Sequence, residues 1–438
     1  MTTIGQNFPM TRKARKEKLD QIKTGPSISM GKVPGKGAKP VYRIPLECLS
    51  YNPYNTRFLA QAKTLEKRFG QDLSDENPAH ILEIEEFIMD EKKDHNKNTI
   101  NSLIKDGQLQ HGVVTADGII LAGNRRFRLL NEIIRNPDKY NSERIRIAGL
   151  EYFEAVILDE DELDKKEIIR YESFYQFGME DKVEYNPIQK YIAANDQKMN
   201  LGFTEQEIAD NFATDKKNIE KRLTVFDLMN EYLEYIGESG IYTALEGREE
   251  AFLQLEGLLK SYRKKSGSIL WAFDENDLSD LKLVFFDYIR LNTPTHDFRI
   301  FKDIFADESQ WKKFKKEQNE IVDKPENCLN PFDEYRVDYP EDDESKISKR
   351  RENDYKQKTA EKLKDLYDVG NAQVHSKKAQ KKPMDILNSI QQELSKLEID
   401  MTNNQNNKTF RTDEFIDAIK DVQNRITRIE QQIERVKG

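Results

Sequence analysis

The sequence has little cysteine and no long apolar run, and both absences narrow the classes of protein it can belong to. Cys48 and Cys328 are the two cysteines of the 438-residue chain, and neither has a histidine or second cysteine nearby at the spacing of a zinc site. A disulfide scaffold and a zinc module are therefore not expected. No segment approaches the roughly 20 apolar residues of a transmembrane helix, and the N-terminal segment has no apolar signal core. We expect a cytoplasmic protein with no membrane partner.

Charge is abundant but is not predominantly of one sign. Charged residues make up 34% of the chain, against roughly 25% in an average domain, and the net charge is −9. A uniformly basic nucleic-acid coat is excluded, and solvated helices are expected beside the packed domains. Residues 1–40 instead carry nine basic and two acidic side chains and include the Gly- and Pro-rich run 31–40. We predict a flexible basic arm here, either a solubilising tail or a phosphate-contacting arm.

The apolar patterns predict an α+β protein, with a small mixed sheet near the N-terminus followed by mostly α-helical segments. Short β-branched runs on both sides of Asp117-Gly118 predict a hairpin. Helices are expected over 64–105, interrupted near Asn77-Pro78. The expected strands cover 41–49, 113–115, 119–121 and 152–158.

The chain divides into six expected parts. They are the basic arm (1–40), a sheet domain (41–160), a helix-turn-helix domain (161–235), a helical domain of unknown role (236–330), a charged linker (331–380) and a C-terminal coiled coil or helical hairpin (381–438). In the last part, apolar residues alternate at spacings of three and four, which indicates a heptad seam. A hairpin within one chain and a zipper between two chains both satisfy this pattern.

After the expected hairpin, a glycine leads into a helix that begins with three arginines. Gly123 lets the backbone approach a ligand, and the first amides of the helix favour a negative group. Arg125, Arg126 and Arg128 add guanidinium groups that match phosphate oxygens. The pattern predicts an anion site. The alternative is a surface helix whose arginines pair with Glu132 or other nearby acids.

This region resembles the N-terminal domain of the ParB/sulfiredoxin superfamily through three boxes in the family's order. The boxes are Asn52-Pro53-Tyr54-Asn55-Thr56-Arg57, Gly107-Gln108-Leu109-Gln110-His111 and Gly123-Asn124-Arg125-Arg126-Phe127-Arg128. The resemblance implies a ParB/sulfiredoxin-like fold over 41–160 and a bound nucleoside triphosphate, CTP or ATP. The nucleotide-binding residues that it implies are Arg57, Gly107, Gln110, Gly123, Asn124, Arg125, Arg126 and Arg128. Asn124 and His111 replace the family's glutamate and proline, so the cognate nucleotide and its hydrolysis stay open.

The family's next motif, Glu-Asn-x-x-Arg, has a partial match further along the chain. Glu172 stands at the glutamate position, whereas Ser173 replaces the asparagine. In the family this glutamate helps to hold Mg2+ near the phosphates, so the resemblance implies Glu172 as a metal ligand. The alternative is an ordinary solvent-facing glutamate of a helix.

Residues 202–226 have the pattern of a helix-turn-helix. Thr204 and Glu207 form a capping box, and Asp215 can cap a recognition helix. Upstream, Asn186-Pro187 resembles the start of the partition family's middle domain. The residues expected to contact DNA are Lys216, Lys217, Asn218, Lys221 and Arg222. Because 186–230 carries six basic and seven acidic residues, a purely structural three-helix bundle is the alternative.

Together these features predict a ParB-like, homodimeric DNA-binding protein whose DNA engagement or dimer state is regulated by a nucleoside triphosphate. A partition, regulatory or mobile-element role and a nucleoside triphosphatase activity are compatible with the prediction. The alternative is a ParB-fold nuclease or nucleotide-dependent phosphotransferase, with His111 near Asp106 and Asp117 as an acid–base group. A structural adaptor organised by its helical C-terminal half is a third possibility.

Overall fold

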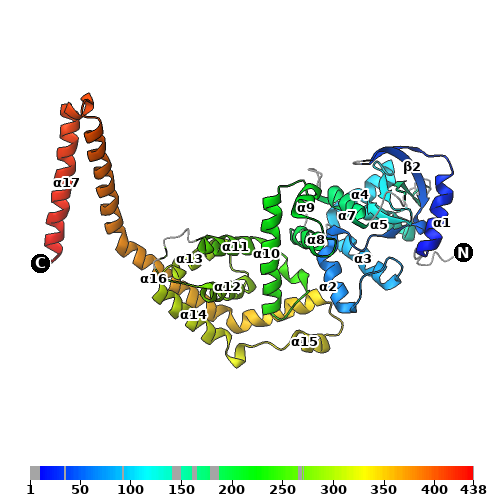
Figure 1. Ribbon diagram of the computed structural model, residues 1–438. Helices are drawn as coiled ribbons and strands as arrows, with labels where there is room; N and C mark the ends of the chain where they lie inside the picture. The colour runs from blue at the N-terminus through cyan, green and yellow to red at the C-terminus, as the bar shows by residue number, and fades with distance from the viewer. Residues whose placement is uncertain are drawn as a thin grey trace. The chain divides into compact units, whose positions relative to one another are not determined.

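The computed structural model describes residues 10–33, 36–90, 93–140, 149–159, 165–177, 187–264, 269 and 271–437 (Figure 1). The chain forms two compact units, 1–364 and 365–438. The expected α+β class is confirmed, because a small mixed sheet near the N-terminus is followed by helices. Among the described helices, none is both long enough and apolar enough to span a membrane.

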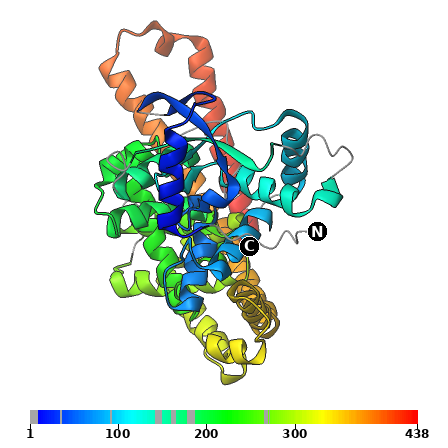
Figure 2. The same cartoon turned by 90° about the vertical axis from the view of Figure 1, so that its right-hand side faces the viewer.

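The predicted flexible arm is wrong for the described part of 1–40. Helix α1 (Arg12–Lys23) is followed by β1 (Ser29–Val33) and β2 (Gly37–Pro45), which pair antiparallel. Gly37 has a φ of 76°, a left-handed conformation that glycine adopts without steric cost. Residues 31–33 and 37–40 of the Gly- and Pro-rich run therefore belong to paired strands, and α1 packs against β2 (Figure 2). Residues 1–9, 34 and 35 lie outside the described residues.

The sheet has six strands in the order β1-β2-β6-β4-β5-β3. The predicted hairpin is confirmed as the antiparallel pair β4 (Gly112–Val114) and β5 (Ile119–Ala122). The strand predicted over 152–158 is confirmed as β6 (Tyr152–Ile157), which pairs parallel with β4 and antiparallel with β2. The short β3 (Ser50–Tyr51) pairs parallel with β5. These mixed directions bring the end of β5 close to the loop after β3.

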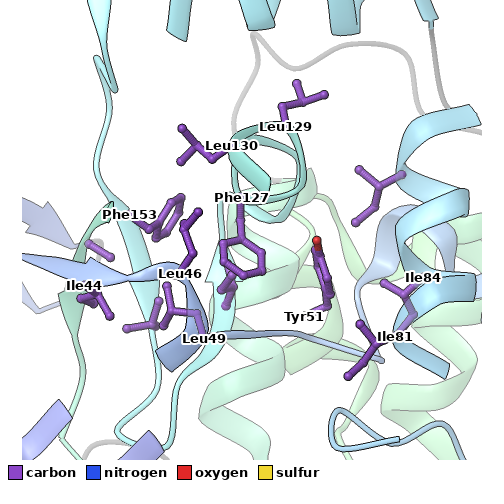
Figure 3. Packing of buried hydrophobic residues seen from close by; sticks show 14 of the residues in the cluster. Ile44, Leu46, Leu49, Tyr51, Ile81, Ile84, Phe127, Leu129, Leu130 and Phe153 are labelled. Carbon is purple, nitrogen blue, oxygen red and sulfur yellow. The ribbon is translucent and has the colours of Figure 1, made fainter. Parts of the chain in front are cut away.

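Helices cover both faces of the sheet, as the alternation of side chains along a strand requires. Val114 and Ile120 enter the larger core, whereas the neighbouring Val113 and Leu121 enter a smaller core that includes Tyr171. In the larger core, the Phe127 ring lies 5.0 Å from that of Tyr51, centroid to centroid (Figure 3). The helices of this part are α2 (Leu59–Phe69), α3 (Pro78–Asp90), α4 (Lys93–Asp106), α5 (Asn124–Arg135), α6 (Pro137–Tyr140) and α7 (Lys165–Phe177).

A buried arginine makes α1 an integral part of the sheet domain. Arg15 is fully buried and forms an ion pair with Asp75, in the segment before α3. Its guanidinium also donates to the carbonyl of Asp117 at 2.9 Å and to that of Met10 at 2.8 Å. The β4–β5 turn, the segment before α3 and the N-terminal helix are thereby held together. This buried pairing explains why a basic segment that looks like a solvated arm is ordered.

The rest of the first unit is helical, and aromatic side chains fill much of its interior. The rings of Tyr232, Phe252 and Phe286 meet edge to face, a geometry that aromatic pairs favour. The helices after the sheet domain are α8 (Ile188–Met199), α9 (Glu205–Asn211), α10 (Lys216–Tyr235), α11 (Glu249–Arg263), α12 (Glu275–Arg290), α13 (Arg299–Phe305), α14 (Glu308–Val322) and α15 (Phe332–Asp338).

The predicted charged linker over 331–380 is wrong. After α15, helix α16 runs from Glu344 to Asn403 without a break at Pro383. Its first turns are packed in the first unit, with Ile347, Tyr355 and Leu363 buried. Buried charge is paired there, since Arg351 forms an ion pair with Glu238. Local charge content predicts solvated chain here, because the partner of Arg351 lies about 110 residues away in the sequence.

The second unit holds the remainder of α16, a short 3-10 turn (Lys408–Arg411) and α17 (Asp413–Lys437). The chain reverses at this turn, so the hairpin alternative describes the fold of a single chain (Figure 1). The heptad seam nevertheless stays exposed on both helices. Its exposed members are Leu387, Ile390, Leu394, Val422, Ile426, Ile429 and Ile433.

Candidate anion site and helix-turn-helix surface

Gly123 shapes the N-terminus of α5 as the sequence pattern predicts. It precedes the helix with a φ of 109° and provides no side-chain cap for the first-turn amides. A Cβ atom at this position would lie 2.7 Å from the Phe153 ring, so any larger residue would displace the core. The first turn of α5 therefore presents its positive end without a capping side chain, which favours a negative ligand.

The structure gives the three arginines of α5 different surroundings. Arg128 pairs with Glu132 at 3.2 Å and with Glu85 at 3.5 Å, as the alternative interpretation expected. Arg125 donates to the side-chain oxygen of Asn96 at 2.9 Å. Arg126 donates to the main-chain carbonyl of Gln110. Within the described residues, Arg126 is thus the arginine of this turn whose contact is a neutral carbonyl rather than a side chain.

Arg126 lies close enough to Arg57 for the two positive charges to interact. Burial, with a smaller contribution from the charge of Arg57, lowers the pKa of Arg126 to about 10. No ion pair of Arg126 is found in the part of the chain that the structure describes. The positive charge of Arg57 disfavours the charged form of Arg126, and an anion bound to Arg126 would offset this effect.

The loop that carries Arg57 adds two polar groups without partners. Arg57 belongs to a 3-10 turn, η2 (Thr56–Phe58), that leads directly into α2. The side-chain nitrogen (Nδ2) of Asn55 and the hydroxyl of Thr56 are buried and have no hydrogen-bond partner among the described residues. Such groups are rare in folded proteins, and an ordered water, an ion or a functional role commonly accounts for them. Arg57 also lines a cleft of about 400 Å3 between α2, α3 and the start of α16.

In the second box, Gln108 makes the contacts that position the loop. Its amide oxygen accepts from the nitrogen of Glu154 at 3.0 Å, and its amide nitrogen donates to the Glu154 carbonyl at 2.5 Å. Gln110, the predicted residue, contributes its main-chain carbonyl to Arg126, and Gly107 ends α4 with a φ of 72°. Sequence reasoning missed Gln108 because its partner strand β6 is about 46 residues away.

Asn124 turns its side chain into the protein. It is 4% exposed, its oxygen accepts from the main-chain nitrogen of Asn52 at 3.4 Å, and its nitrogen donates to the Ile120 carbonyl at 2.9 Å. The first and third boxes are thus joined directly. Asn124 stabilises the junction between the β3 loop and α5, and its contribution to nucleotide binding stays a prediction.

Glu172 is buried, so its interpretation as a solvent-facing glutamate is wrong. Its carboxylate accepts from the side chain of Asn52 and, at 2.7 Å, from the main-chain nitrogen of Thr56. Burial raises the pKa of Glu172 to about 8, although both hydrogen bonds act in the opposite direction. Among the described residues, no cluster of three or more His, Cys, Asp or Glu side chains is arranged to hold a metal. The contacts of Glu172 are those of a group that holds the Asn52–Thr56 loop against α7.

The packing and caps of α8, α9 and α10 agree with the pattern from which a helix-turn-helix is predicted. Helices α8, α9 and α10 pack together, the Thr204–Glu207 capping box is present, and the Asp215 side chain accepts from Asn218 N at the start of α10. Ala213 has a φ of 49° in the turn, the place where many such motifs carry glycine. Pro187 directly precedes α8, whereas Asn186 lies outside the described residues.

The predicted DNA-facing residues differ in how they are held. Lys216, Lys217 and Lys221 are exposed, and Lys216 lies 3.8 Å from Glu220. The exposed Asn218 uses its side chain to bond Thr214 and Asp215. Arg222 is half-buried, stacks 5.4 Å over the Phe212 ring, and has a pKa lowered mainly by burial. Lys217 and Lys221 form no ion pair within the described residues, so they are the cations of this helix most available to a phosphate.

Two members of the acid–base set expected for an enzyme have contacts outside the set. His111 Nε2 lies 3.3 Å from the carbonyl of Lys32. The Asp117 carboxylate contacts the Thr115 hydroxyl and lies 3.4 Å from Arg12. An acid–base role for these residues stays a prediction.

Comparison with known proteins finds a weak likeness. No family model matches the sequence, and no curated protein matches it. A crystal structure of the C-terminally truncated chromosome-partitioning protein ParB from Caulobacter crescentus, complexed with CTP-γ-S, matches 50% of this chain and 92% of that chain. The sequence identity is 14% and the TM-score is 0.19. At this level the match carries no residue role over to the present chain.

Replacing Glu172 by Gln is expected to change how stability depends on pH. A carboxyl whose pKa rises from 4.5 in the unfolded chain to about 8 in the folded protein contributes most stability below pH 4.5 and loses it as the pH rises to 8. The contribution of Glu172 to the free energy of unfolding should therefore fall by on the order of 3–5 kcal/mol between pH 5 and pH 8. Urea unfolding at several pH values measures this slope.

Glu172→Gln should flatten that slope, because the amide does not titrate. The matched control is Glu167→Gln. Glu167 lies on the same helix, is half-buried and pairs with Arg170, and the Glu167→Gln variant should keep the wild-type slope. An unchanged slope in Glu172→Gln would show that this carboxyl is not the titrating group.

Proposed function

We propose that this chain is a DNA-binding protein whose engagement with DNA is regulated by a bound nucleoside triphosphate, CTP or ATP. The observation that carries the proposal is the position of Arg126, at the uncapped N-terminus of α5 and beside a second positive charge, Arg57. A helix N-terminus with two guanidinium groups matches a polyphosphate in both charge and hydrogen-bond geometry.

In this proposal the phosphates lie between Arg126, Arg57 and the first amides of α5. Gly123 lets α5 begin without a capping side chain, and the side-chain nitrogen of Asn55, which has no hydrogen-bond partner among the described residues, is a further donor in the Arg57 loop. Mg2+ would arrive with the triphosphate. Glu172 would have to exchange its hydrogen bonds to Asn52 and Thr56 before it could act as a ligand of that metal.

The N-terminal half of α10 is the proposed DNA-contacting surface. Lys217 and Lys221 lie one helical turn apart and are exposed, so both can reach the phosphate backbone from one face of the helix. The protein is acidic overall, which disfavours non-specific attraction to DNA away from this face. A partition, regulatory or mobile-element role is compatible with such a binder.

The same proposal includes a homodimer that forms through the second unit. The seam of α17 repeats apolar residues with heptad spacing and is exposed in the single chain. A row of exposed apolar side chains of this kind is costly in water and is covered when two such helices pair.

Arg126→Ala is expected to weaken triphosphate binding by about 10- to 100-fold, because a charge-assisted contact to phosphate is lost. Isothermal titration calorimetry with CTP, ATP and GTP, with and without Mg2+, measures the affinities. Arg43→Ala, which removes an exposed arginine of β2 paired with Glu154, should bind as the wild type does. A wild-type protein that binds none of the three triphosphates would refute the nucleotide part of the proposal.

Lys217→Ala combined with Lys221→Ala is expected to weaken binding to all DNA sequences similarly. Removing two phosphate contacts should also reduce the salt slope of the binding constant by about 2. Fluorescence anisotropy over a range of salt concentrations gives both quantities. The control pair Lys312→Ala and Lys316→Ala changes two exposed lysines of α14 at the same spacing. Full affinity in the Lys217/Lys221 variant would place the DNA contact elsewhere.

Ile426→Asp combined with Ile433→Asp is expected to convert the dimer to a monomer, because two charges would enter the seam. Analytical ultracentrifugation measures the mass. Val337→Asp changes an exposed apolar residue of α15, in the first unit, and should leave the dimer intact. A wild-type protein that is monomeric at micromolar concentration would contradict this part of the proposal.

A further inference from the structure

Two buried glutamines of α8 join the helix-turn-helix to the sheet domain. Gln189 is 0% exposed and Gln197 is 1% exposed. A buried primary amide needs partners for both its oxygen and its nitrogen. Both glutamines find these partners on other helices, so each acts as a cross-link between elements that are distant in the sequence.

Gln189 supplies a cap that α2 lacks locally. Phe58, which precedes α2, has no side chain that can accept a hydrogen bond from the first turn. The Gln189 side-chain oxygen accepts from the main-chain nitrogen of Ala60 at 2.7 Å, and its nitrogen donates to the Gln61 side-chain oxygen at 3.0 Å. The free amides of a helix N-terminus need such acceptors. The start of α2 is therefore completed by a residue of the helix-turn-helix domain.

The capped turn directly follows the candidate anion site. Arg57 stands three residues before Ala60, and its own main-chain nitrogen is held by the Asn55 side chain at 2.9 Å. An anion that draws the Arg57 side chain toward Arg126 acts on η2, and η2 is covalently continuous with the first turn of α2. Any shift of this turn changes its hydrogen bond to Gln189, because that bond joins two helices packed side by side (Figure 1).

Gln197 holds the far end of α8. Its amide nitrogen donates to the Ser173 hydroxyl at 2.8 Å, and its oxygen accepts from the Asn211 side chain at 2.9 Å. These bonds tie α8 to α7 and to α9. A displacement of α8 at Gln189 is therefore transmitted to α9 as a movement of connected helices rather than absorbed within one of them.

We propose that Gln189 is the positioning residue through which occupancy of the Arg57–Arg126 site sets the placement of α8 and so of the helix-turn-helix. This inference rests on the proposed function. In this proposal α8 exchanges between two placements relative to α2. A ligand shifts the equilibrium between them only by the difference in its affinity for the two placements. Gln189 supplies the difference, because its bond to the first turn of α2 is made in one placement and weakened in the other.

The test is the ratio of DNA affinities with and without a saturating triphosphate. The probe is CTP or ATP with Mg2+, whichever the full-length wild type binds. Gln189→Met keeps the length of the side chain but removes both hydrogen bonds, and it is expected to reduce the ratio by about 2- to 30-fold while triphosphate binding is retained. Gln189→Glu keeps an acceptor for Ala60 N and should restore a substantial part of the ratio.

Gln318→Met is the matched control. Gln318 is a buried glutamine of α14 that bonds Asp287, in the helical region away from the site, so its substitution disturbs packing without touching α2 or α8. It should leave the ratio unchanged. If the wild type shows no triphosphate dependence, the proposed function itself has failed. If the wild type shows it and Gln189→Met keeps it, or if Gln189→Met no longer binds triphosphate, only the present inference is overturned.

Hydrogen exchange on the wild type provides a readout that does not depend on the folding of a variant. Triphosphate binding should change the exchange rate of the Ala60 amide, which Gln189 protects, and of amides in α8. The first turn of α12, which Asp274 caps within its own segment, should be unaffected. Unchanged exchange at Ala60 on saturation with triphosphate would overturn the inference.

Discussion

The buried carboxyl of Glu172 is the interaction on which the arrangement of the candidate site depends. It holds Asn52 and Thr56, and Asn52 in turn meets Asn124 at the start of α5. Three segments that are far apart in the sequence converge on this cluster: the loop after β3, the N-terminus of α5 and helix α7. A buried carboxyl is stable only when its hydrogen-bonding capacity is used. The loop that carries Arg57 is therefore constrained by α7 before any ligand binds.

The three arginines at the start of α5 lie close together in the sequence but have different surroundings in the structure. Arg125, Arg126 and Arg128 occupy a single helical turn, but successive residues of a helix point in different directions. Arg128 reaches acids of α3 and α5, whereas Arg126 faces the loop of Gln110 and the charge of Arg57. The candidate site is defined less by the number of arginines than by Arg126, for which the described part of the chain contains no ion pair.

Pairing at long range also explains the two segments that were expected to be solvated and are ordered. In α1, Arg15 pairs with Asp75. In α16, Arg351 pairs with Glu238, and Glu352 pairs with Arg248. A charged residue is compatible with burial when a partner of opposite sign is present, and local composition carries no information about a partner 60 to 110 residues away. High charge content therefore predicted exposure in places where the structure has buried ion pairs.

The sequence by itself determined the features that depend on neighbouring residues. The β4–β5 hairpin follows from its Asp-Gly turn, the entry into α5 from Gly123, and the caps of α9 and α10 from Thr204, Glu207 and Asp215, because each of these is set within a few residues. Only the tertiary structure decided that Gln108 rather than Gln110 bonds β6 through its side chain, that Asn124 faces inward, and that Gln189 caps α2. These contacts join segments that loop closure brings together, and a side chain's partner across such a distance is fixed by the packing of the whole domain rather than by its local pattern.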